Sequence, residues 1–403
     1  MKQVTWLQIL IVSFQLGLTS FGGPVAHLGY FHEKYVKRKQ WIDEHSYADL
    51  VALCQFLPGP ASSKVGIGIG FMCGGVLGAI MAWIGFTLPS AAVLAVFAYL
   101  SQGMDSGSAG WLHGLKLAAV AIVVQAVWGM GKSLAPDKGR ATIAILTAAI
   151  SLLVPSTYTQ VLLLISAGIV GLLLYKPNSS GPSSKPDSEQ ALLGTTSALS
   201  SPLYKKLAIC CLIAFFVLLF ALPLLRSIYP NIWLAMFDSF YRTGALVFGG
   251  GHVVLPLLEQ EMVPTGWLGK EQFLAGYGAA QAIPGPLFTF ASYLGFMIHG
   301  WTGAVVATLS IFLPAFLLVM GALPFWNQLR SHPHTRGALT AINAAVVGIL
   351  LAALYDPVWT STVKTPADFV LALFLYGALL FWKLPSWCVV ALSIVGGMLL
   401  GAL

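Results

Sequence analysis

Two stretches of this sequence share an interruption that decides the fold: QFLPGPASSKVGIGIGF at 55–71 and QAIPGPLFTFASYLGF at 281–296. In each, a Pro-Gly-Pro triplet, at 58–60 or 284–286, separates two apolar segments of 12 or 13 residues. Each proline removes a backbone N–H and clashes with the preceding turn, so a helix cannot continue through the triplet. A membrane crossing needs about 20 apolar residues. We therefore expect broken or re-entrant helices at both triplets.

The composition shows what kind of protein contains these segments. Hydrophobic residues make up 57% of the 403 residues and charged residues only 9%, whereas soluble domains carry about 25% charged residues. A soluble enzyme, a nucleic-acid binder and a disordered protein are excluded. The net charge of +7 is typical of basic cytoplasmic loops. The predicted fold class is an all-α polytopic membrane protein.

The motifs recur in the same order in both halves of the chain. Phe-Gly-Gly at 21–23 and 248–250 is offset by 227 residues (248 − 21), and Leu-Pro at 88–89 and 313–314 by 225 (314 − 89). Such an ordered series predicts two homologous repeats, an arrangement common in transporters. The predicted division is an N-terminal transport repeat at 1–175, a polar Ser/Pro-rich linker at 176–204, a connecting apolar helix at 205–229 and a C-terminal transport repeat at 230–403.

Equivalent loops of the two repeats differ in charge. Lys34, Lys37, Arg38 and Lys39 follow the first Phe-Gly-Gly, whereas only Lys270 follows the second. Because basic loops stay cytoplasmic, the repeats are expected to have inverted topology. The absolute orientation stays open, because the basic flanks of the linker dispute the orientation that residues 33–44 favour.

A helix that restarts after Pro-Gly-Pro presents unpaired N–H groups and the positive end of its dipole, which suits an anion. Lys64 adds a charge inside an apolar segment, where charge usually marks function, and Gln55 and Gln281 precede the triplets by three residues. The candidate binding residues are Phe21, Gly22, Gly23, Gln55, Pro58, Gly59, Pro60, Ala61, Ser62, Ser63 and Lys64, with Phe248, Gly249, Gly250, Gly251, His252, Gln281, Pro284, Gly285, Pro286, Leu287, Phe288 and Thr289.

Each of these signals has a plainer alternative. In the alternative interpretation, the triplets are kinks used only for packing and the Phe-Gly-Gly segments only allow close helix contact. Lys64 would then extend its ammonium to the membrane interface. The sequence contains no HExxH, GxSxG or paired intramembrane carboxylates. We therefore expect a protein that is not an enzyme and uses no metal or cofactor.

The motif pair resembles the chromate ion transporter family, in its long form with two fused domains. The matching stretches are SFGGPVAHLGYF at 20–31 with QFLPGP at 55–60, and VFGGGHVVLPLLEQE at 247–261 with GYGAAQAIPGPLFTFASYLG at 276–295. The resemblance covers nearly the whole chain. It implies a multi-pass protein of the inner (plasma) membrane that exports chromate from the cytoplasm and confers chromate resistance.

Alternating access driven by membrane potential or ion exchange is the expected mechanism of such a secondary transporter. Two alternatives stay open: an uptake carrier or exchanger for sulfate or another oxyanion, and a membrane enzyme or lipid-handling scaffold, which the lack of paired catalytic groups disfavours. The expected partners are chromate, sulfate as a related oxyanion, and the lipid bilayer, with no nucleic acid. A homodimer is among the assemblies that the sequence allows.

Overall fold

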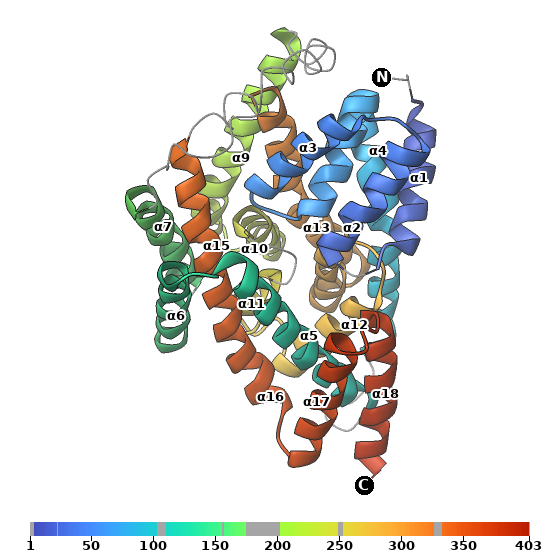
Figure 1. The fold of residues 1–403 in the computed structure, drawn as a ribbon, viewed down its shortest axis with the longest axis vertical. Coiled ribbons are helices and arrows are strands. Elements are labelled where there is room, and N and C mark those ends of the chain that lie inside the picture. Colours follow the sequence, from blue (N-terminus) through green and yellow to red (C-terminus); the bar gives the residue numbers. More distant parts are fainter. Residues whose placement is uncertain are drawn as a thin grey trace.

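The structure is a computed structural model that describes residues 4–21, 23–102, 110–154, 157–174, 202–248, 253–325 and 333–402, and within these ranges all regular elements are helical (Figure 1). The elements before the linker are α1 (Trp6–Thr19), α2 (Gly23–Phe31), η1 (His32–Arg38), α3 (Glu44–Phe56), α4 (Ala61–Ser101), α5 (Gly110–Leu134), α6 (Lys138–Leu153) and α7 (Thr157–Leu174). Those after it are α9 (Pro202–Ile228), α10 (Ile232–Leu246), α11 (Val254–Met262), α12 (Lys270–Ala282), η4 (Leu287–Thr289), α13 (Phe290–Ala322), η5 (Leu323–Phe325), α15 (Pro333–Ala353), η6 (Leu354–Trp359), α16 (Thr360–Thr362), α17 (Pro366–Leu380) and α18 (Ser386–Ala402).

Several of these helices suit a bilayer. Among the described residues, five helical stretches are long and apolar enough to cross a membrane, and four shorter apolar helices accompany them. The five are 61–101, 110–134, 204–228, 287–325 and 337–362. The all-helical, multi-pass character expected from composition is confirmed. The expected linker, 176–204, lies outside the described residues up to 201, and residues 202–204 already belong to α9.

Both Pro-Gly-Pro triplets interrupt the helices. α3 ends at Phe56 and α4 begins at Ala61, while α12 ends at Ala282 and η4 begins at Leu287. Gly59 and Gly285 have φ angles of 99° and 104°, in a region that costs an L-residue about 1–2 kcal/mol. The helix breaks predicted at 58–60 and 284–286 are confirmed.

The two longest helices contain a second, equivalent break. The backbone is non-helical at Gly74–Gly75 in α4 and at His299–Gly300 in α13. A Cβ atom added to Gly70 would lie 2.4 Å from the carbonyl oxygen of Gly78. Residues eight apart in a continuous helix lie about 12 Å apart along its axis. Each long helix is therefore a tight helical hairpin with its turn at the break.

Equivalent helices of the two halves run antiparallel. Trp83 in α4 contacts Phe312 in α13, with ring centroids 5.7 Å apart, and Tyr99 contacts Trp301 at 6.3 Å. As the residue number rises along α4, its partner's number falls along α13. The arms that follow the two breaks, residues 76–101 of α4 and 301–322 of α13, therefore run in opposite directions.

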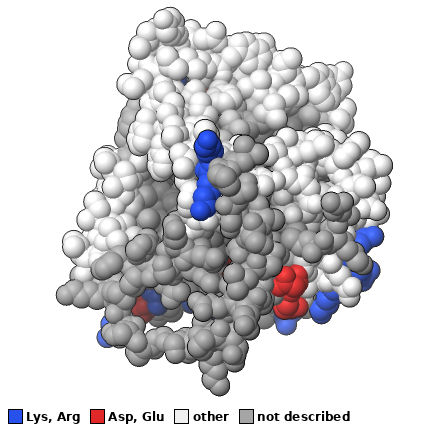
Figure 2. Space-filling view, turned by 90° about the horizontal axis from the view of Figure 1, so that it is seen from above, with Lys and Arg blue, Asp and Glu red and all other residues white. Residues whose placement is uncertain are grey.

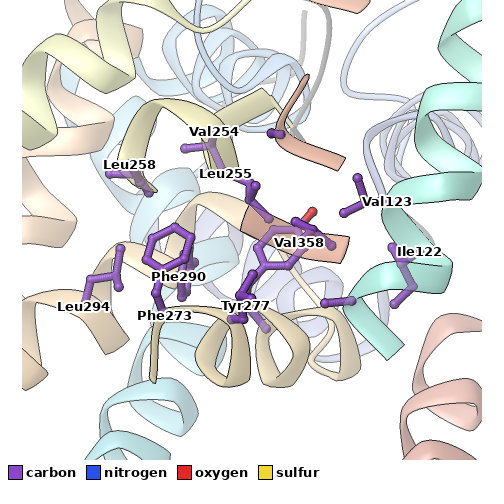
Figure 3. Packing of buried hydrophobic residues seen from close by; sticks show 14 of the residues in the cluster. Ile122, Val123, Val254, Leu255, Leu258, Phe273, Tyr277, Phe290, Leu294 and Val358 are labelled. Atoms are coloured by element: carbon purple, nitrogen blue, oxygen red, sulfur yellow. The ribbon is translucent and has the colours of Figure 1, made fainter. Parts of the chain in front are cut away.

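The halves also interlock through their later helices. α5 packs against α17 and α18, whereas its equivalent, α15, packs against α6 and α7 (Figure 1). The backbones touch there, since a Cβ on Gly114 would lie 2.0 Å from the Ser393 carbonyl oxygen, and one on Gly348 would lie 2.2 Å from that of Ala144. Figure 3 shows the largest core, in which Ile122 and Val123 of the first half meet residues of the second. Each half therefore completes the core of the other.

One end of the molecule is basic. Lys34, Lys37 and Arg38 lie there, in η1 directly after α2. The start of α9 lies at the same end, since the Tyr204 ring is 5.8 Å from that of Phe71. Figure 2 shows this end, with Lys and Arg near its middle and along one edge, and Asp and Glu beside them. A hydrogen bond from Arg38, 3.0 Å, holds the pKa of the exposed Glu33 carboxyl below its usual value.

Candidate functional site

The two Pro-Gly-Pro turns are each bound to the other half of the chain. The Gly59 N–H donates to the carbonyl of Val247 at 2.6 Å, and the Gly285 N–H donates to the carbonyl of Ser20 at 2.9 Å. Val247 and Ser20 are equivalent residues that directly precede the Phe-Gly-Gly motifs. We call the contact of residues 58–60 with the end of α10 the first crossing, and that of residues 284–286 with the end of α1 the second crossing.

Both crossings depend on close backbone contact. A Cβ on Gly59 would lie 3.2 Å from the carbonyl oxygen of Gly244 and 4.0 Å from the Ala315 Cβ. A Cβ on Gly285 would lie 2.8 Å from the Ser90 hydroxyl oxygen. Ala315 and Ser90 directly follow the two Leu-Pro motifs, so all three motif pairs found in the sequence meet at the crossings. A kink used for packing is consistent with these contacts, and a role of the triplets in anion binding stays a prediction.

Histidine 27 connects the start of α4 to the second crossing. Its Nδ1 atom lies 3.2 Å from the Ser62 hydroxyl oxygen, and its ring hydrogen-bonds the backbone of Ser20. Ser62 lies two residues after the first Pro-Gly-Pro, and Ser20 accepts the Gly285 N–H. A continuous chain of hydrogen bonds therefore joins the two Pro-Gly-Pro segments. Ser20 and His27 were not among the residues predicted from the sequence.

Buried polar atoms near the crossings lack partners. Within the described ranges, no hydrogen bond reaches the hydroxyls of Ser20, Ser63 and Thr87, or the side-chain nitrogen of Gln281. The three hydroxyl-bearing residues are almost fully buried. A buried donor without a partner costs about 1–3 kcal/mol, so a ligand that accepts hydrogen bonds from these atoms would remove that cost. These atoms are available to an oxygen-rich ligand.

The restarted helices add backbone donors. α4 begins after Pro60 and η4 after Pro286, and neither start has a side-chain cap. The first N–H groups of a helix have no partner within it. In the second half, the Thr289 hydroxyl donates a hydrogen bond of 2.7 Å to the carbonyl of Pro286 and so is not free for a ligand. The first half therefore offers more free donors than the second.

Lys64 is completely buried, with 0% of its side chain exposed. Its ammonium donates to the carbonyl of Leu57 and, at 3.0 Å, to that of Pro58. No carboxylate within the described ranges pairs with it. In this conformation Lys64 holds the first Pro-Gly-Pro turn together, so it does not extend to an interface. Its equivalent, Phe290, is buried among aromatic rings. The predicted contact of Lys64 with the anion stays a prediction.

The two glutamines occupy different environments. Gln55 is exposed on α3, whereas Gln281 is half-buried and hydrogen-bonds Tyr277. The aligned sequence positions therefore do not give equivalent sites.

The remaining candidates lie around the crossings. Phe21 and Phe248 are half-buried, and the Phe21 ring lies 6.4 Å from that of Trp387. Pro60, Pro286 and Phe288 are buried; Pro58, Ala61, Pro284 and Leu287 are half-buried; and Gly23 begins α2 with a φ angle of 78°. The predicted residues that lie outside the described ranges are Gly22, Gly249, Gly250, Gly251 and His252.

A partly buried group of charged residues in the second half was not predicted from the sequence. Arg226, Asp238, Arg242 and Glu261 come from α9, α10 and α11 and form ion pairs of 2.9–3.7 Å. Glu261 carried a signal in the sequence, but as an acidic residue of a loop. Within the described ranges, no three His, Cys, Asp or Glu side chains are placed to hold a metal ion.

Comparison with known proteins gives a consistent result. A family model described as "Chromate transporter" matches residues 7–172 and 234–401. The chain is 27% identical to the chromate transport protein of Pseudomonas aeruginosa, over 90% of this chain and 84% of that protein. Its identity to the chromate transport protein of Cupriavidus metallidurans is also 27%, over 94% and 89%. A probable chromate transport protein of Synechococcus elongatus is 25% identical, over 84% and 81%. No solved structure matches the chain.

Proposed function

We propose that this chain, which belongs to the chromate transporter family, exports chromate from the cytoplasm and binds it between the two crossings. The observation that carries the proposal is the reciprocal pairing of Gly59 with Val247 and of Gly285 with Ser20, together with buried donors without partners on the same segments of the chain. Broken helices survive at membrane depth only where they are packed in protein or line a cavity. A substrate site is the use that transporter folds commonly make of such breaks.

The donors suit a tetrahedral oxyanion. Chromate has four oxygens that accept hydrogen bonds, and the hydroxyls of Ser20, Ser63 and Thr87 can each donate one. The uncapped start of α4 supplies backbone N–H groups and the positive end of a helix dipole. We expect Lys64 to add its positive charge next to this start. Anion binding then satisfies donors that are otherwise left unpaired.

The geometry supports an inverted repeat. The long helices α4 and α13 are antiparallel, and the connecting helix α9 has 27 residues, a length of about 40 Å. α9 starts at the basic end beside Phe71 and ends where α10 begins. α10 therefore enters from the side opposite to its equivalent, α1. If the basic end is cytoplasmic, Lys205 and Lys206 at the start of α9 lie on the same side as residues 33–44, as the basic charge of both segments favours.

Alternating access follows from this symmetry. The two crossings are equivalent but oppositely oriented, so rocking one half against the other opens the site to one side at a time. The interior-negative potential of the inner (plasma) membrane favours outward movement of an anion by about 2.3 kcal/mol per charge per 100 mV, hence about 4.6 kcal/mol for a dianion. Export therefore needs no ATP.

Flux measurements in oriented vesicles test the proposal. Inside-out vesicles with an interior-positive potential should accumulate labelled chromate, and vesicles without the protein should not. Sulfate has the same shape and charge as chromate, so we expect it to compete, while molybdate tests the size limit. Net sulfate uptake by right-side-out vesicles, with no chromate movement in inside-out ones, would support the uptake carrier and overturn export. Hydrolysis of a lipid that depends on residues 58–60 would revive the enzyme alternative.

A further inference from the structure

Four charged side chains form a partly buried cluster among the second-half helices. Arg226 Nη1 lies 3.2 Å from Asp238 Oδ2, and Arg242 Nη2 lies 2.9 Å from the same oxygen. Arg242 also lies 3.1 Å from Glu261 Oε1, and the Ser239 hydroxyl donates to Glu261 Oε2 at 2.8 Å. We call Arg226, Asp238, Arg242 and Glu261 the charge cluster. It ties α9, α10 and α11 together.

The charge cluster is balanced in charge but incomplete in hydrogen bonds. The Asp238 side chain is 1% exposed and that of Glu261 is 7% exposed. Buried ions are stable only when their hydrogen-bonding atoms are well satisfied. Yet Asp238 Oδ1 and Arg242 Nε have no partner within the part of the chain that the structure describes. The cluster therefore retains a free acceptor at its most buried carboxylate.

The first half shows that packing does not require these charges. The positions equivalent to Asp238, Arg242 and Glu261, 227 residues earlier, are Ile11, Gln15 and Lys34. There, a single hydrogen bond of 3.0 Å joins Lys34 to Gln15, and Ile11 is exposed on the surface. Arg226 lies on α9, the helix that connects the two halves. The charge cluster is thus a feature of one repeat only, and buried charges inside membrane proteins usually mark function.

We propose that the charge cluster is a proton-binding centre coupled to oxyanion transport, and that Asp238 carries the proton on Oδ1. This inference rests on the proposed transport function. A proton from water forms an O–H bond at Oδ1 without displacing any donor. Glu261 Oε2 accepts hydrogen bonds from Ser239 and Arg242, and Oε1 lies 3.1 Å from Arg242 Nη2, so a proton on either oxygen would compete with one of these contacts. Protonation changes the net charge of the cluster from zero to +1 and weakens the attraction between Asp238 and the two arginines.

The position of Asp238 connects it to the substrate site. Asp238 lies in α10, a single helix of 15 residues that ends directly before Val247. The Val247 carbonyl accepts the Gly59 N–H at the first crossing. Weaker contacts with Arg226 free α10 from α9, so a movement of α10 is carried to the first crossing. Proton binding and the opening of the oxyanion site are thereby linked.

Other ionisable groups also lie on or against α10, and the experiment must distinguish their protonation from that of Asp238. Arg226 faces it from α9, Glu261 from α11 and His299 from α13, while Arg242 and Tyr241 lie on α10 itself. The His299 ring stacks on Trp233 at 4.4 Å and is exposed at the kink of α13. His299 is therefore replaced separately in the test below.

Proteoliposomes with the full-length protein test this proposal. The membrane potential is clamped at zero, a gradient of one pH unit is imposed, and chromate accumulation and internal pH are recorded together. One unit is a tenfold difference in proton activity, so one-to-one coupling supports an accumulation ratio of up to about tenfold. We expect the wild-type protein to exceed a ratio of one and to move protons with chromate.

Two charge-balanced double variants identify the proton carrier. Arg226→Gln with Asp238→Asn leaves the Arg242–Glu261 pair, and we expect the accumulation ratio to fall to one. Arg242→Gln with Glu261→Gln leaves the Arg226–Asp238 pair, and we expect the ratio to stay above one. His299→Gln should match the wild-type protein. Asp238→Glu, which keeps the carboxylate, should retain proton movement with a shifted pH midpoint; it provides the test if the first variant does not fold.

The outcomes separate the two levels of the proposal. Proton movement that persists in the first double variant, or that disappears in the second while the protein stays folded, overturns the assignment to Asp238. Wild-type chromate flux without proton movement overturns the coupling and leaves the transport function intact. No wild-type flux of chromate or sulfate under either a potential or a pH gradient refutes the proposed function itself.

Discussion

Replacing Gly285 by alanine tests the second crossing at its closest contact. The φ angle of 104° at Gly285 costs an alanine about 1–2 kcal/mol. Its Cβ would also lie 2.8 Å from the Ser90 hydroxyl oxygen and 3.3 Å from the Ser90 Cβ, and overpacking of this kind costs about 1–3 kcal/mol. We expect Gly285→Ala to be destabilised by about 2–5 kcal/mol and to lose most chromate transport.

A double variant separates the two terms. Ser90→Gly removes Oγ and Cβ, the two atoms closest to the new Cβ, so it should recover the steric part, about 1–3 kcal/mol, but not the part from backbone strain. Gly129→Ala is the matched control, because a Cβ there meets nothing within 4 Å and Gly129 lies inside a helix. Thermal unfolding in detergent and chromate flux in vesicles are the two readouts. The reasoning is refuted if Gly285→Ala matches Gly129→Ala, or if Ser90→Gly gives no recovery.

Three further predictions address the donors, Lys64 and the topology. Ser63→Ala removes a hydroxyl without a partner, so thermal stability should stay the same or rise. Chromate affinity should fall about tenfold, a loss of about 1.4 kcal/mol. The control, Ser393→Ala, removes a hydroxyl that donates to the carbonyl of Val390 and should lower stability only. Lys64→Gln should insert into the membrane normally but bind chromate weakly, and wild-type transport by this variant would refute a role for Lys64 at the site. Single cysteines at Lys39 and Lys206 should react with an impermeant thiol reagent from one side of the membrane, and a single cysteine at Lys364 should react from the other side. Labelling of all three positions from the same side would contradict the inverted repeat.

The sequence was sufficient to predict the helix breaks at the two Pro-Gly-Pro triplets, though the breaks at Gly74–Gly75 and His299–Gly300 were not predicted. Proline acts on its own backbone and on the preceding turn, so the interruptions at 58–60 and 284–286 are local properties. The ordered motif pairs likewise predicted two related halves. Both predictions depend on residues that are close together in the chain or on simple alignment.

Contacts between residues that are far apart in the sequence could not be predicted from local patterns or alignment. Nothing in the sequence indicates that Gly59 bonds Val247, or that α5 packs with α17 and α18, because many pairings bury similar apolar area. Lys64 stood out by its charge, but its carbonyl partners depend on how the Pro-Gly-Pro turn folds back. The ion pair of Asp238 with Arg226 was not predicted, because only the folded chain brings α9, α10 and α11 together around these residues.

The most direct measurement is the position of chromium in a crystal of the protein with bound chromate, located by its anomalous scattering. Our account predicts one chromium atom between the Pro-Gly-Pro segments, with its oxygens within hydrogen-bonding distance of the Ser63 hydroxyl and the first backbone N–H groups of α4. A chromium atom bound elsewhere, for example at Arg226 and Arg242, or a site that leaves the hydroxyls of Ser20 and Ser63 without a partner, would contradict it.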